Sequence, residues 1–250
     1  MSSGTDARVA RATRVGRGAT PRTGAGEPVS PAKQWEIRAA ARAVTRPADT
    51  NGRDFADDII RAGWALVEGD GVLDFTVKQV IERAGVALQT FYRYFGNKDE
   101  LILAMFEESM RDAAARVLVD PRAKDPVEHL RHLVTQPIVM RYGEKERRVL
   151  RWRGRERQRL LESFPDAVEA VYEPYRAALA EAIVAVCAAG RGSCEAPDVD
   201  ALLILHLVQE MAHGVHGGGI RDRPKVVAER VWHMIWSGLT GPETRHRPRR

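Results

Sequence analysis

The spacing of apolar positions predicts helices almost throughout residues 51–240. After Asp54, a residue type that often caps helices, Phe55, Ile59 and Leu66 fall on one helical face, and two glycines follow. The pattern therefore predicts an all-α fold. Beyond the N-terminal region, prolines and glycines divide it into further helices at about 126–140, 145–164, 166–190, 198–218 and 224–239.

A helix, a tight glycine turn and a second short helix are predicted on either side of residue 85. Thr76 and Gln79 have the spacing of a capping box, so a helix should begin at Thr76. Gly85 stands where a left-handed helix end favours glycine. A short helix over 88–95 follows, and Asn97 is the N-cap candidate of a longer helix. This order is typical of a helix-turn-helix.

The short helix carries the residue types that contact DNA. Phe91 and Phe95 are four residues apart and suited to burial, which leaves the opposite face for solvent or a partner. Gln and Arg side chains can bind base edges in pairs of hydrogen bonds, whereas Thr and Tyr hydroxyls suit phosphates. The alternative is a plain three-helix bundle with an aromatic packing helix. The outward residues are Gln89, Thr90, Arg93 and Tyr94.

Residues 75–101 resemble the signature of the TetR family of bacterial repressors, with Ala-Gly-Val before the short helix and Lys-Asp-Glu-Leu after it. The resemblance implies a homodimer that binds double-stranded operator DNA through three N-terminal helices and a small-molecule effector through a larger helical domain. Ala87 and Gln89 stand where many members have Ser and Gly, so the operator sequence does not follow from the resemblance. The implied DNA-binding residues are Thr76, Lys78, Gln89, Thr90, Tyr92, Arg93, Tyr94 and Lys98.

Composition divides the chain into four parts. Residues 1–50 are rich in Gly, Ala, Ser, Thr, Pro and Arg, and we expect a disordered basic extension there. Residues 51–100 are the expected helix-turn-helix domain, 101–240 the effector-binding and dimerisation domain, and 241–250 a basic tail. The net charge of +5 arises at the two ends, so the bulk charge is weak evidence for DNA binding.

The last two predicted helices have apolar stripes that suit a four-helix dimer bundle, as the resemblance implies. The alternative is that these stripes form the ordinary core of one chain. The expected dimer residues are Leu202, Leu205, Val208, Val231 and Ile235. Aromatic, histidine and methionine positions of the C-terminal domain supply the effector candidates, namely Met105, Phe106, His132, Trp152, Tyr172 and His213.

Two polar clusters have alternative interpretations. His206, His213 and His216 share a helical face, but without a cysteine or second carboxylate we favour histidines that bind no metal, and we expect no metal or cofactor. An arginine run at spacings of three and four suits either an acidic effector or, as we favour, a solvated helix face. It comprises Arg148, Arg151, Arg155 and Arg159, with Arg153 and Arg157 beside it.

Composition and motifs exclude several classes of protein. With 44% hydrophobic and 29% charged residues, and apolar runs far shorter than a membrane span, the chain is expected to be cytoplasmic with no membrane partner. Cys187 and Cys194 have no metal or redox spacing and are expected to be reduced thiols. The common nucleophile, nucleotide and zinc-protease motifs are absent, so we expect no enzyme. We expect a ligand-responsive DNA-binding regulator, with a non-sensing architectural DNA-binding protein or a helical enzyme as alternatives.

Overall fold

The computed structural model describes residues 55–71, 73–119, 124–192 and 195–241. Within these ranges every regular element is a helix, which confirms the all-α prediction. The expected N-terminal extension and nearly all of the expected basic tail lie outside the described residues. None of the described helices combines the length and apolar character needed to span a membrane.

Three short helices form an N-terminal unit, which we call the head. Helix α2 (Phe55–Trp64) continues into a π-helical turn, η2 (Ala65–Gly69), and is followed by α3 (Val77–Ala84) and α4 (Leu88–Tyr94). The single helix predicted after Asp54 therefore changes to π geometry in its last turn, a feature often found near functional sites.

The helix ends of the head form as predicted. The Thr76 hydroxyl accepts a hydrogen bond from the backbone N–H of Gln79, and the Gln79 side chain accepts one from the backbone N–H of Thr76, which completes the capping box. Gly85 ends α3 in the left-handed conformation at φ 66°, where a side chain would be strained. Asn97 caps α5 by accepting from the backbone N–H of Glu100 at 3.0 Å.

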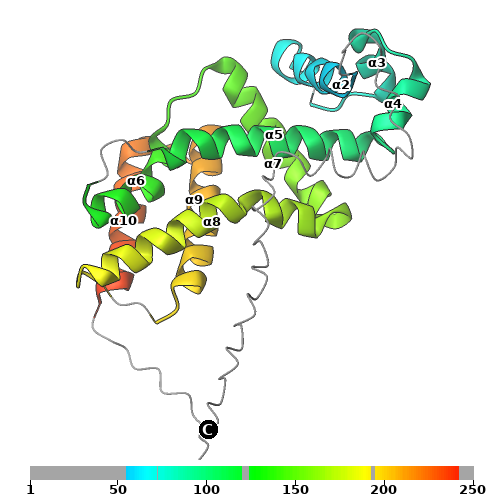
Figure 1. The fold of residues 1–250 in the computed structure, drawn as a ribbon. Coiled ribbons are helices and arrows are strands. Elements are labelled where there is room, and N and C mark those ends of the chain that lie inside the picture. Colours follow the sequence, from blue (N-terminus) through cyan, green and yellow to red (C-terminus); the bar gives the residue numbers. More distant parts are fainter. Residues whose placement is uncertain (1–54, 72, 120–123, 193–194, 242–250) are drawn as a thin grey trace, which may run out of the picture.

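Helix α5 (Lys98–Leu118) runs from the head into the C-terminal domain, as Figure 1 shows. Every side chain from Leu101 to Phe106 is buried, because both domains pack around this part of the helix. One apolar cluster includes residues of the head, the start of α5, Trp152 and Val168. The head is therefore joined to the rest of the chain by a continuous core as well as by the chain itself.

The C-terminal domain consists of five helices, and their bounds agree closely with the predicted ranges. Four of them begin with a proline, which suits the first turn because its missing N–H would have no helical partner. A second apolar cluster, formed mainly by α6, α8, α9 and α10, fills this domain. The helices are α6 (Pro126–Val139), α7 (Glu144–Ser163), α8 (Pro165–Ala188), α9 (Pro197–Gly217) and α10 (Pro224–Thr240).

Two local features of this domain departed from simple expectation. Pro137 lies inside α6, where it has no N–H to donate to the carbonyl of Leu133, four residues before it. The buried Tyr175 hydroxyl of α8 donates to that carbonyl instead, at 2.6 Å. The expectation of a reduced thiol is wrong for Cys187, which is disulfide-bonded.

Candidate nucleic-acid interface and ligand cavity

Helix α4 presents a polar face because its two phenylalanines are buried. Phe91 is 0% exposed and Phe95 is 2% exposed, and their ring centroids are 5.8 Å apart beneath the helix. Gln89 and Arg93 are exposed, as the helical spacing predicts, and Tyr92, which only the resemblance implied, is exposed as well. This face has the side chains needed to bind base edges and phosphates.

The other predicted DNA-binding residues surround this face with less exposure. Thr76 and Lys78 are exposed at the start of α3, and the Thr76 hydroxyl also donates to the Gln79 side chain at 3.0 Å. Thr90 and Tyr94 are half-buried, and Tyr94 packs partly against the apolar core. The helix-turn-helix therefore exposes Thr76, Lys78, Gln89, Tyr92 and Arg93 more fully than Thr90, Tyr94 and Lys98.

Charge pairing makes the head less basic than a count of its lysines and arginines indicates. Lys98 is bound to Asp74 at 2.6 Å and lies 5.6 Å from the centroid of the Phe75 ring. Arg83 pairs with Asp70 at 2.8 Å, and Lys78 lies 3.8 Å from Glu82. Arg93 forms no ion pair or hydrogen bond within the described part of the chain. Arg93 is thus the cation of the α4 face that is free to bind DNA.

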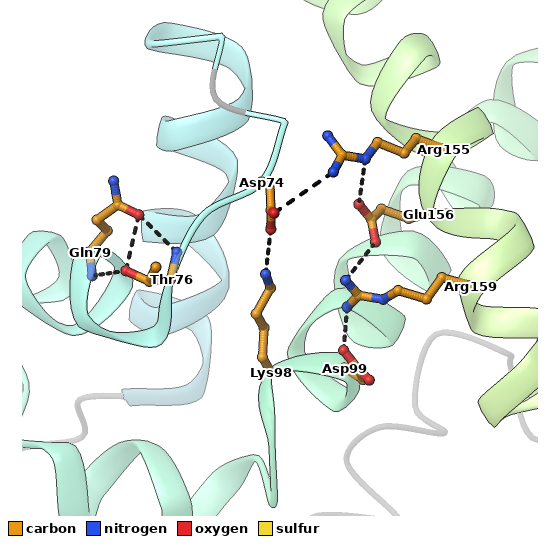
Figure 2. Close-up of polar contacts among 8 residues, drawn as sticks. All are labelled: Asp74, Thr76, Gln79, Lys98, Asp99, Arg155, Glu156 and Arg159. Carbon is orange, nitrogen blue, oxygen red and sulfur yellow. Dashed lines mark hydrogen bonds and ion pairs between the residues drawn. The ribbon is translucent and has the colours of Figure 1, made fainter.

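An ion-pair network joins the head to α7, and Figure 2 shows its members. Asp74 contacts Lys98 and also lies 3.7 Å from Arg155. Arg155 lies 3.9 Å from Glu156, which lies 3.5 Å from Arg159. Arg159 in turn contacts Asp99 at the start of α5. We call these six residues the junction network.

The electrostatics of the junction network depend on how deeply each carboxylate is buried. The hydrogen bond from Lys98 lowers the pKa of Asp74 below its usual value. Burial raises the pKa of Glu156, although Arg159 and Arg155 oppose that increase. Exposed ion pairs contribute at most about 1 kcal/mol each, but a buried carboxylate is costly without its partners. Glu156 is therefore the member of the junction network whose partners contribute most to stability.

A neighbouring arginine binds the π-helical turn of the head. Arg148 of α7 donates to the backbone carbonyls of Glu68 and Gly69, at 2.7 and 2.9 Å. Together with Arg155 and Arg159, it shows that the arginine run contacts the head, and neither an effector nor solvent alone accounts for it. The interpretation of this run as a solvated face therefore needs correction for Arg148 and Arg159, which are partly covered by their partners, whereas Arg155 is 52% exposed and agrees with it.

Aromatic packing completes the junction. Trp64 at the end of α2 packs edge-on against Trp152 of α7, with ring centroids 5.1 Å apart, and its indole N–H donates to Glu108 at 2.6 Å. Met105 fills the space beside Gly63, where a Cβ would come within 2.6 Å of its sulfur. Trp152 and Met105 are thus fully buried between the domains.

A cavity of about 320 Å³ lies beyond the junction, between α5, α7, α8 and α9. Three predicted effector residues, Phe106, Tyr172 and His213, line it. The structure does not bring the other three to it, which corrects the prediction for them. Met105 and Trp152 are core residues, and the His132 imidazole is 3.1 Å from the carbonyl of Val117. The cavity is otherwise lined mainly by apolar and aromatic side chains, among them Met110, Val117, Leu150, Val171 and Tyr175.

A second cavity, of about 380 Å³, opens between α5, α7 and the head. Its lining includes Trp64 and Glu68 of the head, together with Glu108 and Arg116 of α5. The two cavities share wall residues and therefore adjoin each other. The shared residues are Ala113, Tyr142, Leu150 and Arg153.

Arg153 was not among the predicted effector residues. Burial lowers its pKa below the ordinary value, and the charged or ionisable neighbours that affect it are Tyr142, Tyr172 and Arg116. No carboxylate of the described residues is within ion-pair distance of it, and its hydrogen bonds there go to Ser109, both at 3.5 Å. The sequence did contain a signal: Arg153 and Arg157 are out of phase with the arginines that bind the head, so they occupy another face of α7.

The histidines of α9 are separated by their surroundings. His206 and His213 are exposed, whereas His216 is half-buried and lies 3.1 Å from the carbonyl of Pro137. The Tyr142 ring packs edge-on against the His216 ring at 4.5 Å, and burial lowers the pKa of His216. Within the described ranges no three His, Cys, Asp or Glu side chains form a group suited to a metal ion.

The predicted dimer residues lie mostly inside the chain's own core. Leu205, Val208, Val231 and Ile235 are between 0 and 8% exposed in a single chain, which corrects the prediction that they form a dimer face. Leu202 is exposed, as expected of an interface residue. A second apolar face of α9 and α10 lies toward solvent. That face includes Val199, Leu203, Val226 and Met234.

The head contains a capped helix-turn-helix with a polar outer face, and it is joined to a helical domain that contains a cavity. This is the architecture expected of a helix-turn-helix regulator. Residues 59–105 match the family model described as bacterial regulatory proteins of the tetR family. Over these residues the match confirms the resemblance to TetR-family regulators that was seen in the sequence.

Solved structures share the fold over about three quarters of this chain. A TetR-family regulator from Rhodococcus sp. is 19% identical, with a TM-score of 0.57 over 73% of this chain and 97% of that one. The fatty acid degradation regulator FadR from Bacillus halodurans is 19% identical, with a TM-score of 0.52 over 75% and 97%. Bacillus subtilis FadR in complex with stearoyl-CoA is 17% identical, with a TM-score of 0.51 over 73% and 98%. No curated protein matches the sequence.

Proposed function

We propose that this protein is a ligand-responsive repressor that binds a palindromic operator as a homodimer and is released by a small amphiphilic molecule. The observation that carries the proposal is the position of the cavity of about 320 Å³, whose walls include α5 and α7, the helices that also hold the head. The likeness in fold to a FadR that binds stearoyl-CoA supports an amphiphilic effector. A cytoplasmic location is expected for such a regulator.

Helix α7 is the proposed link between effector and DNA. Arg155 contacts Asp74 of the head and Arg159 contacts Asp99 at the start of α5. Arg153 and Arg157 of the same helix line the cavity. A ligand that shifts or rotates α7 changes both sets of contacts at once. Helix α5 is a second route, because Phe106 lines the cavity and Lys98 begins the same helix beside α4. The ligand acts only through a difference in affinity between the two states of the junction.

Selection of bound fragments from a random DNA pool tests the proposed DNA binding. We expect enrichment of a palindrome whose half-sites are about 34–36 Å apart, or a multiple of this spacing, because two heads related by a two-fold axis meet matching grooves. An architectural DNA-binding protein would enrich no sequence. Arg93→Ala is the matched control, since it removes the unpaired cation of the α4 face and leaves the buried residues intact.

The coupling can be tested before any effector is known, because coupling between two sites is reciprocal. Binding of the selected operator should change hydrogen exchange of α7, residues 144–163, and of α5 at residues 97–110. Arg155→Gln combined with Arg159→Gln should abolish the change in α7. Arg151→Gln is the control, because Arg151 is on α7 but contacts Glu144 of the same helix. Unaltered exchange in α7 and α5 on operator binding would contradict the proposed link.

A further inference from the structure

Arg153 lies at the wall that the two cavities share, with apolar and aromatic side chains on the side of the cavity of about 320 Å³. Phe106, Met110 and Val117 line that cavity. Tyr142 and Tyr172 line it as well and lie close enough to affect the pKa of Arg153. The guanidinium is a planar donor with five N–H groups. Among the described residues it donates only to Ser109, in two long contacts of 3.5 Å.

Burial of a guanidinium with so few partners in a partly apolar environment costs free energy. Removing a charge from water is unfavourable unless an opposite charge and hydrogen bonds replace the water. The other arginines of α7 differ in this respect, because Arg155 and Arg159 have carboxylate partners. Arg157 lies 6.0 Å from the centroid of the Tyr172 ring and has that ring as a partner. Charged groups that are unfavourable for the empty fold are concentrated at functional sites.

We infer that the effector carries a carboxylate, which binds the guanidinium of Arg153, and an alkyl or aryl part that fills the cavity toward Phe106 and Met110. This inference rests on the proposed function. A carboxylate matches the guanidinium through two parallel hydrogen bonds and supplies the missing opposite charge. The volume of about 320 Å³ is at the lower end of small-molecule sites, which favours a medium-chain acid over a long one.

The charge of the other lining residues is consistent with this orientation. Glu210, the carboxylate that lines this cavity, is an exposed residue of α9 and does not pair with Arg153. Arg157 and Arg153 both belong to α7, so the cationic side of the cavity is α7. A carboxylate bound there acts directly on the helix that contacts the head through Arg155 and the start of α5 through Arg159.

Binding of three probes with the same ten-carbon chain tests the inference: decanoate, decan-1-ol and decyltrimethylammonium. Affinities are measured by titration calorimetry below the micellar concentrations, with tryptophan fluorescence as a second signal. We expect wild-type protein to bind decanoate at least tenfold more tightly than decan-1-ol, and decyltrimethylammonium most weakly. Arg153→Met should remove the preference for decanoate while it retains binding of decan-1-ol, which also shows that the variant is folded. Arg151→Gln, whose side chain lines neither cavity, should behave like wild type.

Each other outcome overturns the inference in a different way. Equal affinity for decanoate and decan-1-ol in wild type, or a preference for decanoate that survives Arg153→Met, overturns the carboxylate assignment and leaves the amphiphilic effector of the proposed function standing. Failure of all three probes to bind overturns both the carboxylate assignment and the amphiphilic effector. Selection of a DNA sequence is independent of all these results and tests the regulator itself.

Discussion

The imidazole of His213 on α9 occupies the space that a side chain at Gly154 of α7 would fill. A Cβ on Gly154 would lie 2.5 Å from Nε2 of His213 and closer still to Cε1, and real Cβ atoms essentially never approach this closely. Both residues line the cavity of about 320 Å³. Glycine at this position therefore allows α7 and α9 to hold the imidazole between them.

Gly154→Ala should displace the His213 imidazole, and the stability of the variant should depend on residue 213. Alanine in a helix interior normally stabilises by about 0.5–1 kcal/mol relative to glycine. We expect that gain in a His213→Ala background, where the obstacle is gone, and little or no gain in the wild-type background. Urea unfolding of the four proteins of this double-mutant cycle measures the difference. Equal gains in both backgrounds would show that the imidazole does not occupy this space.

Tyr175→Phe should destabilise the C-terminal domain by about 1–3 kcal/mol, because it leaves the buried carbonyl of Leu133 without a donor. Pro137→Ala returns an N–H to the position that can donate to the same carbonyl. The Tyr175→Phe change should therefore cost less in the Pro137→Ala background. Denaturant unfolding of the single and double variants checks this, and an undiminished cost in the double variant would argue against the shared carbonyl.

The pH dependence of stability should include a contribution from His216. Because burial lowers its pKa from the ordinary 6.5, the unfolded chain takes up a proton at higher pH than the folded protein does. The contribution of His216 to the free energy of unfolding is thus fully present above about pH 6.5. It declines as the pH falls through 6.5 toward the lowered pKa. His216→Gln should flatten the fall in melting temperature between pH 7 and pH 5. The matched control is His206→Gln, an exposed position on the same helix.

Arg93→Ala and Gln89→Ala should each reduce operator affinity by about 1–3 kcal/mol and relax the preference at one position of each half-site, if these side chains bind base edges. Lys78→Ala should weaken binding to all sequences alike and reduce the salt dependence by about one ion, as expected of a phosphate contact. Affinities for the selected operator and its single-base variants, measured at several salt concentrations, separate the two effects. Unchanged selectivity in both Arg93→Ala and Gln89→Ala would remove α4 from base recognition.

Leu203→Glu and Met234→Glu should split a homodimer without unfolding the chain, because both side chains are more than 60% exposed in one chain. Leu205→Glu should instead unfold the domain, since it would bury an unpaired charge in the core. Sedimentation velocity gives the oligomeric state, and circular dichroism shows whether each variant is folded. A wild-type monomer at micromolar concentration would contradict the proposed dimer.

Local rules account for the part of the molecule that the sequence predicts well. The capping box at Thr76, the left-handed Gly85 and the burial of Phe91 and Phe95 depend on neighbours within a few residues, and all formed as predicted. The starts of four helices in the C-terminal domain followed the prolines for the same reason. These features are encoded by short spacings, which a single sequence displays directly.

Contacts between distant elements account for what the sequence did not predict. The sequence shows the helical phase of the arginine run of α7, but only the fold reveals that Asp74 of the head and Asp99 at the start of α5 face it. Met105 and Phe106 are adjacent in the sequence, yet one packs on Gly63 and the other lines the cavity. The apolar faces of α9 are likewise indistinguishable until it is known which one α8 covers.

The two hydrogen bonds from Arg148 to the carbonyls of Glu68 and Gly69 mean that the first helix of the head is ended by a residue eighty positions away. Carbonyls at a helix end need donors, and here the C-terminal domain provides them. The head is therefore not a freely exchangeable module. A chimaera that joins this head to another regulator's sensing domain needs an arginine at the position equivalent to 148. Without it, the carbonyls at the C-terminal end of the first helix of the head lack these donors.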